Sequence, residues 1–433
     1  MTILSQIQKQ ILSIGIIIIF IILIFLAIYW LRKSLKKNKN TKMLVLNMVI
    51  KYNVFINYVK FRLTNKEKIL LYYVSIDNLN VLEKKYDNNI IHLYLRTVAK
   101  NLSICLPYGG KLAQTKQRDT FIICVPYYDI DPYAYGETLK NVVLERFSKN
   151  DIQIVKNVSV GYIDEFSGDL RKDLDCLKNA LIQSKRSLGS IVKYTKESNA
   201  SILDFKNIYE QINSTILNYQ CFDIYKIALK QINEEYVMPT INNESYHLFF
   251  QKLPILDKSW ANMWLIENLL YVYSDNNQGT KNINLPVYIS SLENEAFIDC
   301  LQSMLITSLY TPEQIIISLK YSQFRNEQNI IKNLLLLKNI GFQISYKVED
   351  IMPELYSIIQ SYHINRLEIN RELLENTNVE ELLYFSKVNH LEVVLFNNVS
   401  TPIEQLGSGI THVAKLSGKL PVSEKKSRNR GNK

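Results

Sequence analysis

The sequence predicts a mixed α/β protein, with two soluble domains behind a single N-terminal transmembrane helix. An apolar run interrupted only by Ser13 and Gly15 extends from Ile11 to Leu31. Behind it, short apolar runs alternate with segments of helical period, which is typical of a sheet covered by helices. In the second half these strand–helix units repeat over roughly 200 residues, which predicts a parallel barrel or a wound sheet.

The apolar run is long enough to cross a bilayer. As a helix, residues 11–31 would span about 31 Å, which matches a hydrocarbon core of about 30 Å. Tyr29 and Trp30 lie at its end, where aromatic rings favour the headgroup layer. One cation, Lys9, precedes the run, and a basic collar follows it: Arg32, Lys33, Lys36, Lys37, Lys39 and Lys42. This asymmetry predicts a single-pass protein of the cell membrane, with the N-terminus outside and the C-terminal domains in the cytoplasm.

The net charge of +10 comes entirely from the two ends of the chain. The basic collar and the C-terminal cations account for it, so the rest of the chain sums to zero. Basic segments outside a folded domain favour anionic lipid headgroups over nucleic acid as the partner. The five cysteines are dispersed without CxxC spacing, so neither a zinc site nor a disulfide framework is expected. No cofactor is expected either.

The apolar runs divide the chain into segments. We expect a short extracytoplasmic end (1–10), the transmembrane helix (11–31) and a basic linker (32–43). A first α/β domain (44–197), a helical linker (198–236), a second α/β domain (237–420) and a basic disordered tail (421–433) follow. The strands expected from apolar runs are 69–76, 121–125 and 158–162 in the first domain, and 247–250, 286–289, 314–319, 342–346, 366–369 and 391–396 in the second.

Four segments in the first domain resemble the GGDEF domain of bacterial diguanylate cyclases, in the same order and spacing. They are YYVSIDNLNVLEKKYDNN (72–89), QRDTFIICVP (117–126), VSVGYID (158–164) and LKNALIQSKRSLGSIVKY (177–194). The resemblance implies an α/β sandwich. It also implies that Ser75 stands at the position of the first metal-binding Asp. Gln117 and Arg118 stand at the positions of the paired glycines, and Glu83 and His92 at the positions that contact guanine.

The second domain resembles the EAL domain, the cyclic di-GMP phosphodiesterase often fused behind a GGDEF domain. Glu267-Asn268-Leu269 falls at the EAL position, after a candidate first strand HLFFQKLPIL. Further matches are PVYIS (286–290), IIISLKYS (315–322), LLLLKNIGFQISYKV (334–348), HINRLEINRELL (363–374) and FNNVST (396–401). The resemblance implies a β/α barrel, and because the region is short, a shortened one.

Most of the metal-binding acids implied by the two resemblances are replaced. In the first domain the acid Asp119 remains, and Thr120 stands at the position of the next acid. In the second, Glu267 remains, and the other positions hold Tyr288, Ser318, Tyr321, Lys347, Val348, Glu368, Asn370, Asn397 and Ser400. Since two cations need a ring of carboxylates, neither domain is expected to catalyse. The position of the phosphate-binding arginine after EAL holds Tyr271.

We therefore expect a probable pseudo-enzyme: a catalytically inactive GGDEF–EAL-like signalling or scaffold protein that acts through protein partners or self-association. One alternative is a sensor that binds cyclic di-GMP or another nucleotide in the EAL-like cleft. Asp77, Asp119, Glu267 and Tyr271 are its candidate ligand-binding residues, and no residue is expected to be catalytic or to bind metal. The other alternative is an enzyme with a re-used pocket, built from Asp77, Asp119, Glu267 and Glu368.

Overall fold

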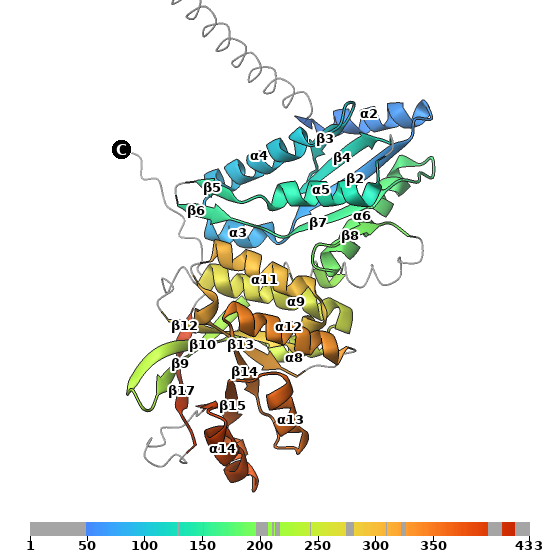
Figure 1. Ribbon diagram of the computed structural model, residues 1–433. Helices are drawn as coiled ribbons and strands as arrows, with labels where there is room; N and C mark the ends of the chain where they lie inside the picture. The colour runs from blue at the N-terminus through green and yellow to red at the C-terminus, as the bar shows by residue number, and fades with distance from the viewer. Residues whose placement is uncertain are drawn as a thin grey trace, which may run out of the picture.

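A computed structural model describes residues 49–127, 130–149, 151–195, 207–209, 212, 217–242, 244–273, 281–308, 310–321, 326–396 and 409–420. The expected transmembrane helix, basic linker and C-terminal tail lie outside these ranges, as do Asn397 and Ser400. Within them, no helix has the length and apolar character needed to cross a membrane. The described chain forms two α/β domains stacked end to end (Figure 1).

The first domain is a six-stranded sheet in the order β1-β3-β4-β2-β7-β8. Its strands are β1 Val49–Ile50, β2 Ile69–Ile76, β3 Lys111–Gln114, β4 Thr120–Pro126, β7 Val158–Ile163 and β8 Ile191–Lys193. The three central strands β2, β4 and β7 are buried at every position. Burial on both faces explains why each of them is a continuous apolar run.

Helices cover both faces of this sheet. Side chains of α2 (Tyr52–Thr64) and α6 (Leu170–Arg186) share one core with the sheet, and those of α3 (Leu79–Lys85), α4 (Asn88–Ile104) and α5 (Pro132–Leu144) share the other. A small hairpin, β5 (Phe147–Lys149) and β6 (Ile152–Ile154), lies beside them. The α/β sandwich expected for this domain is confirmed.

The second domain is a barrel. Among the described residues, eight strands form its ring: β9 Leu217–Lys226, β10 Gln231–Ile241, β12 Asn282–Tyr288, β13 Ile315–Lys320, β14 Gln343–Lys347, β15 Arg366–Asn370, β16 Glu392–Phe396 and β17 His412–Leu420. The ring closes because β9 pairs antiparallel with both β10 and β17, whereas the other neighbours are parallel. A two-residue strand, β11 (Glu244–Ser245), pairs outside the ring with β10.

Helices and short helical turns connect these strands: α8 Tyr246–Gln251, α9 Ile255–Asn268, η2 Leu269–Tyr273, η3 Ile289–Glu293, α11 Ala296–Thr307, η4 Pro312–Gln314, α12 Glu327–Ile340, α13 Glu354–Ser361, η5 Arg371–Glu375 and α14 Val379–Val388. Helices α9 and α11 lie on the side of the barrel that faces the first domain (Figure 1).

Three expectations for the second domain are wrong. Residues 217–226 and 231–236 belong to strands β9 and β10, not to a helical linker over 198–236. Many of their outward side chains are polar, and the inward Glu234 is a buried carboxylate. These two strands therefore lack the apolar run by which the other strands were recognised. The run 247–250 lies in helix α8, because a four-residue apolar run does not distinguish strand from helix. The third is the expectation of a shortened barrel: the described residues form a closed ring of eight strands.

Candidate functional site

In the first domain, hydroxyl groups occupy the place that the resemblance gives to metal-binding acids. Ser75 is the penultimate residue of the buried strand β2, and Thr120 begins β4 opposite it. The Thr120 Oγ1 donates to Ser75 Oγ at 3.2 Å and lies 2.9 Å from Asp119 Oδ1. The remaining carboxylate, Asp119, also meets the ammonium of Lys185 at 3.5 Å. One carboxylate that already faces an ammonium cannot gather divalent cations.

The nucleotide side of this cluster is closed by an ion pair. Arg118 stands at a glycine position of the GGDEF turn, and Glu83 at a guanine-contacting position. The Arg118 Nη1 lies 2.8 Å from Glu83 Oε1. A glycine turn lets a backbone approach phosphate, whereas here a long side chain crosses to the opposite helix. The two positions are joined to each other instead of to a ligand.

Asp77 lies just beyond β2 and is buried, with 6 % of its surface exposed. Its carboxylate accepts hydrogen bonds from Ser159 Oγ at 2.9 Å and from Asn157 Nδ2 at 3.0 Å. Burial raises the pKa of Asp77 to about 6, although the nearby Lys185 and the Ser159 hydrogen bond act to lower it. Asp77 is thus a structural carboxylate that bonds within its own domain and lies at the contact with the barrel.

This burial predicts a pH dependence of stability. Because the folded-state pKa of Asp77 is raised, the folded chain binds this proton more tightly than the unfolded chain. Stability from this group is therefore present below pH 4 and is lost as pH rises to about 6, by up to about 3 kcal/mol. We expect Asp77→Asn to remove this loss, measured as the urea unfolding midpoint between pH 4 and 7.5. Asp175→Asn, at an exposed position, is the control; equal pH profiles for Asp77→Asn and the parent would contradict the expectation.

Glu267 does not lie at a strand end of the barrel, so its assignment to the EAL position is wrong. It is the penultimate residue of helix α9, is 1 % exposed, and points into the contact between the two domains. There it pairs with the ammonium of Lys156 and accepts from Asn78 Nδ2 at 2.9 Å. The error follows from taking α8 for the first barrel strand, which shifted the register of the match.

Two further lysines of the first domain reach the barrel beside this pair, one exposed (Lys84) and one half-buried (Lys85). Lys84 Nζ donates to Asn268 Oδ1 at 3.3 Å, and Lys85 Nζ donates to the Thr307 carbonyl at 3.2 Å. The cavity beside Glu267, lined also by Asp77 and Lys156, has a volume of about 10 Å³. Such a space accommodates at most about one water molecule, so no nucleotide fits between the domains here.

Tyr271 is also part of this contact and not of the barrel mouth. It is fully buried, and the ammonium groups of Lys85 and Lys156 lie 5.2 and 5.8 Å from the centre of its ring. These are cation–π contacts that join the barrel to the first domain. A ligand-binding role for Tyr271 would require this contact to open.

Inside the barrel, an ion pair lies among the positions that the resemblance assigns to metal ligands. Lys320 Nζ, 5 % exposed by residue, donates to Glu368 Oε2 at 3.1 Å and to Tyr236 Oη at 2.9 Å. Glu368 also accepts from Ser345 Oγ at 2.8 Å. Burial acts to raise the pKa of Glu368, but Lys320 and the hydrogen bonds of its neighbours overcome this and lower it. The ammonium group of Lys320 thus supplies the positive charge beside Glu368, where the resemblance implies metal ions.

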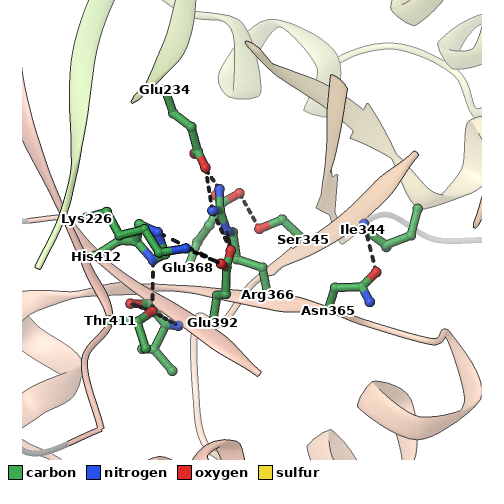
Figure 2. A network of polar contacts seen from close by, with 11 residues as sticks. Lys226, Glu234, Ile344, Ser345, Asn365, Arg366, Glu368, Glu392, Thr411 and His412 are labelled. Atoms are coloured by element: carbon green, nitrogen blue, oxygen red, sulfur yellow. Dashed lines mark hydrogen bonds and ion pairs between the residues drawn. The ribbon is translucent and has the colours of Figure 1, made fainter. Parts of the chain in front are cut away.

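A second network fills the opposite end of the barrel interior, at the start of β15, β16 and β17. Arg366, 2 % exposed, donates through Nη1 and Nη2 to the two Glu234 oxygens at 2.6 Å each, and through Nη2 and Nε to Glu392 Oε2 at 2.6 and 3.0 Å. Figure 2 shows the guanidinium between the two carboxylates, with His412 and Lys226 beside Glu392. Glu234, Glu392 and His412 lie close enough to share a metal ion, but two cations already balance the two carboxylates: Arg366 bonds both, and Lys226 Nζ lies 3.4 Å from Glu392 Oε1.

These interior networks were not predicted from the sequence. Their signal is a charged residue within an apolar strand, as in IIISLK (315–320) and RLEIN (366–370). Since the side chains of a strand alternate, Arg366 and Glu368 must point to the same face, and both are buried. A buried charge requires a partner, so the pattern could have indicated an ion-paired barrel interior.

At the carboxyl ends of β14 and β15, the mouth of the barrel has a pocket of about 220 Å³. Its polar lining consists of carboxylates and amides: Glu349, Asp350, Asn370, Glu372 and Asn376. This is the end at which barrel enzymes bind their substrates. The pocket is smaller than a usual ligand site of about 300–1,000 Å³, and its acids repel phosphate.

No protein-family model matches the chain. Among curated proteins, the chain is 22 % identical over 146 residues to the UDP-N-acetylmuramate–L-alanine ligase of Pseudothermotoga lettingae, a match over 33 % of this chain and 32 % of the ligase. The chain thus spans about a third of the length of the curated relative it matches.

The solved structures to which the chain is similar are of another kind. One is the S helix–GGDEF–EAL portion of Vibrio cholerae LapD bound to c-di-GMP, at 12 % identity, covering 88 % of this chain and 99 % of that one, with a TM-score of 0.40. Klebsiella pneumoniae BlrP1, in a manganese and cy-diGMP complex, is 12 % identical, with coverage of 82 and 96 % and a TM-score of 0.39. An EAL domain protein from Listeria monocytogenes is 15 % identical, with coverage of 48 and 90 % and a TM-score of 0.40. The structural neighbours of this chain are GGDEF–EAL tandem proteins and EAL domain proteins.

Proposed function

We propose that this chain is a catalytically silent GGDEF–EAL-like scaffold, anchored at the cytoplasmic face of the cell membrane and acting through protein partners. Its apolar segment 11–31 and the basic collar behind it would fix its position. The two domains would present their outer surfaces to partners. The observations below support loss of catalysis in each domain.

The observation that carries the proposal is the ion pair of Lys320 and Glu368 inside the barrel. A phosphodiesterase of the EAL kind would need several carboxylates there, to bind two metal ions and activate water. Here the ammonium of Lys320 sits on one carboxylate, and the neighbouring positions hold Ser318, Ser345 and Lys347. A divalent cation at this place would meet positive charge in place of ligands.

The first domain supports the same conclusion independently. Cyclase chemistry requires metal ions on the triphosphate and an open turn for the nucleotide. Asp119 faces Lys185, and Arg118 crosses the turn to Glu83. The residues after Ser75 also contact the barrel, since Asn78 donates to Glu267. The domain therefore offers neither a cation site nor an open approach.

The alternative of a cyclic di-GMP sensor has less support. Glu349, Asp350 and Glu372 line the described part of the barrel mouth, and they would repel a dianionic ligand. Tyr271, which the sequence match placed at the position of the phosphate-binding arginine, lies in the domain contact instead. A residual enzyme is disfavoured because Asp77, Glu267 and Glu368 are buried in three separate hydrogen-bonded networks.

The test is an assay of the full chain in detergent, with GTP or cyclic di-GMP and either Mg²⁺ or Mn²⁺. We expect no product above that from heat-denatured protein, beside an active GGDEF–EAL enzyme as positive control. Calorimetry with cyclic di-GMP is expected to give no binding heat. Turnover that disappears in Asp119→Ala or Glu368→Ala would refute the proposal, and saturable binding heat would favour the sensor.

A further inference from the structure

Helix α2 carries apolar side chains on two faces, although only one face contacts the core. Phe55 and Val59 are fully buried against the sheet. Val54 and Phe61, by contrast, are 53 % and 61 % exposed. With Tyr58 between them they are spaced i, i+4 and i+7, so they form one stripe along the outside of the helix. A second apolar face on a helix already packed on its own sheet indicates a surface outside the domain.

Tyr108 extends this stripe. It is 98 % exposed and belongs to the turn between α4 and β3. That turn lies against α2, because the Tyr58 hydroxyl donates to the carbonyl of Gly109. Val54, Phe61 and Tyr108, together with the exposed Lys51 and Lys60 of the same helix, form what we call the α2 surface.

Charge along the α2 surface is mainly basic. Between Val49 and Ile69 the only acid is Glu67, which pairs with Arg62, whereas the basic residues are Lys51, Lys60, Arg62, Lys66 and Lys68. The turn that carries Tyr108 leads into Lys111, and residues 105–114 contain no acid; Asp164 and Glu165 lie near Lys66 and Lys68, beyond the end of the helix. Exposed aromatic and aliphatic side chains among lysines are typical of a helix that lies on an anionic bilayer.

The α2 surface is also the part of the described chain nearest in sequence to the expected anchor. Strand β1 is the edge strand of the sheet, and α2 follows it directly. Residues 32–48 join the anchor to β1, and even fully extended they reach no more than about 60 Å. Helix α2 and the barrel helix α14 lie at opposite ends of the molecule (Figure 1), so the anchor is attached at the α2 end.

We propose that the α2 surface docks on the anionic lipid of the membrane that holds the anchor. This rests on the membrane anchoring proposed above and adds an orientation to it. The sheet edge at β1 lies toward the bilayer, Phe61 and Tyr108 insert among the headgroups, and the lysines meet lipid phosphates. The barrel then extends into the cytoplasm, where its surface is open to partners.

The test is photo-crosslinking of the full chain in vesicles of phosphatidylcholine with or without phosphatidylglycerol. Benzoyl-phenylalanine replaces Phe61, Tyr108 or, as a matched control, Tyr384 of α14, which is 71 % exposed. We expect lipid adducts by mass spectrometry at positions 61 and 108, several-fold more with phosphatidylglycerol, and none at 384. Each labelled chain must melt at the temperature of the unlabelled chain.

The outcomes separate the two proposals. Flotation with vesicles after alkaline carbonate extraction reports the anchor alone. A chain that floats but gives no lipid adduct at 61 or 108, or gives adducts to a second copy of the chain or to another protein, overturns the docking and leaves the anchor intact. A chain that fails to float overturns both. Equal lipid adducts at 61, 108 and 384 also overturn the docking, because they mean that no face is preferred.

Discussion

Replacing Arg366 by methionine is expected to destabilise the barrel by about 3–5 kcal/mol, because it leaves a buried carboxylate without its partner. The side chains of Arg366 and Glu234 are 2 % and 4 % exposed, and the guanidinium bonds both Glu234 oxygens. Burial acts to lower the pKa of Arg366, but Glu234 and Glu392 outweigh it and raise that pKa above its usual value. The guanidinium therefore stays charged in the parent. In Arg366→Met the buried Glu234 carboxylate must either keep its charge without that partner or take up a proton.

Urea unfolding of the full chain, followed by tryptophan fluorescence, measures this effect. Lys332→Met is the control, since its pair with Glu295 is exposed, at 66 % and 67 %, and is expected to contribute at most about 1 kcal/mol. The double variant Arg366→Met with Glu234→Leu should recover much of the lost stability, because the buried Glu234 is removed with its partner, and Glu392, 34 % exposed, keeps its pair with Lys226. A loss in Arg366→Met no larger than in Lys332→Met would mean that water reaches the network and screens it.

Replacing Glu267 by alanine is expected to weaken the contact between the two domains by a similar amount, about 3–5 kcal/mol. The side chains of Glu267 and Lys156 are 1 % and 2 % exposed, and they come from different domains. Burial acts to lower the pKa of Lys156, so without Glu267 the amine must lose its proton or draw water into the contact. Asn78 would lose its acceptor as well.

Hydrogen exchange is the direct measurement. We expect faster exchange in α3 and α9 of Glu267→Ala, with the central strands β2 and β4 unchanged. Glu244→Ala is the control on the barrel, because its pair with Lys252 is exposed, at 54 % and 68 %. The double variant Lys156→Met with Glu267→Leu should restore protection. If α3 and α9 exchange at the parental rate in Glu267→Ala, the contact does not depend on this ion pair.

The resemblance of the sequence to GGDEF and EAL segments led to the correct fold for both domains, but to the wrong place for Glu267 and Tyr271. All five runs expected as barrel strands after residue 280 needed only their ends adjusted, because each is short and bounded by polar turns. Strands β9 and β10 were missed, because Glu234 and Tyr236 are polar on the inward face. Their partners, Arg366 and Lys320, lie far along the chain.

The amino-acid sequence alone is enough to predict the layers of the first domain and the repeated βα units of the second. These follow from local properties: periodicity and apolar runs. Where the buried charges lie is set by the tertiary structure. Glu267 belongs to the domain contact, Glu368 pairs with Lys320, and Arg366 joins Glu234 to Glu392. Such pairs are set by the closing of the ring and the docking of the domains, and no local pattern encodes contacts between residues 26 to 189 positions apart.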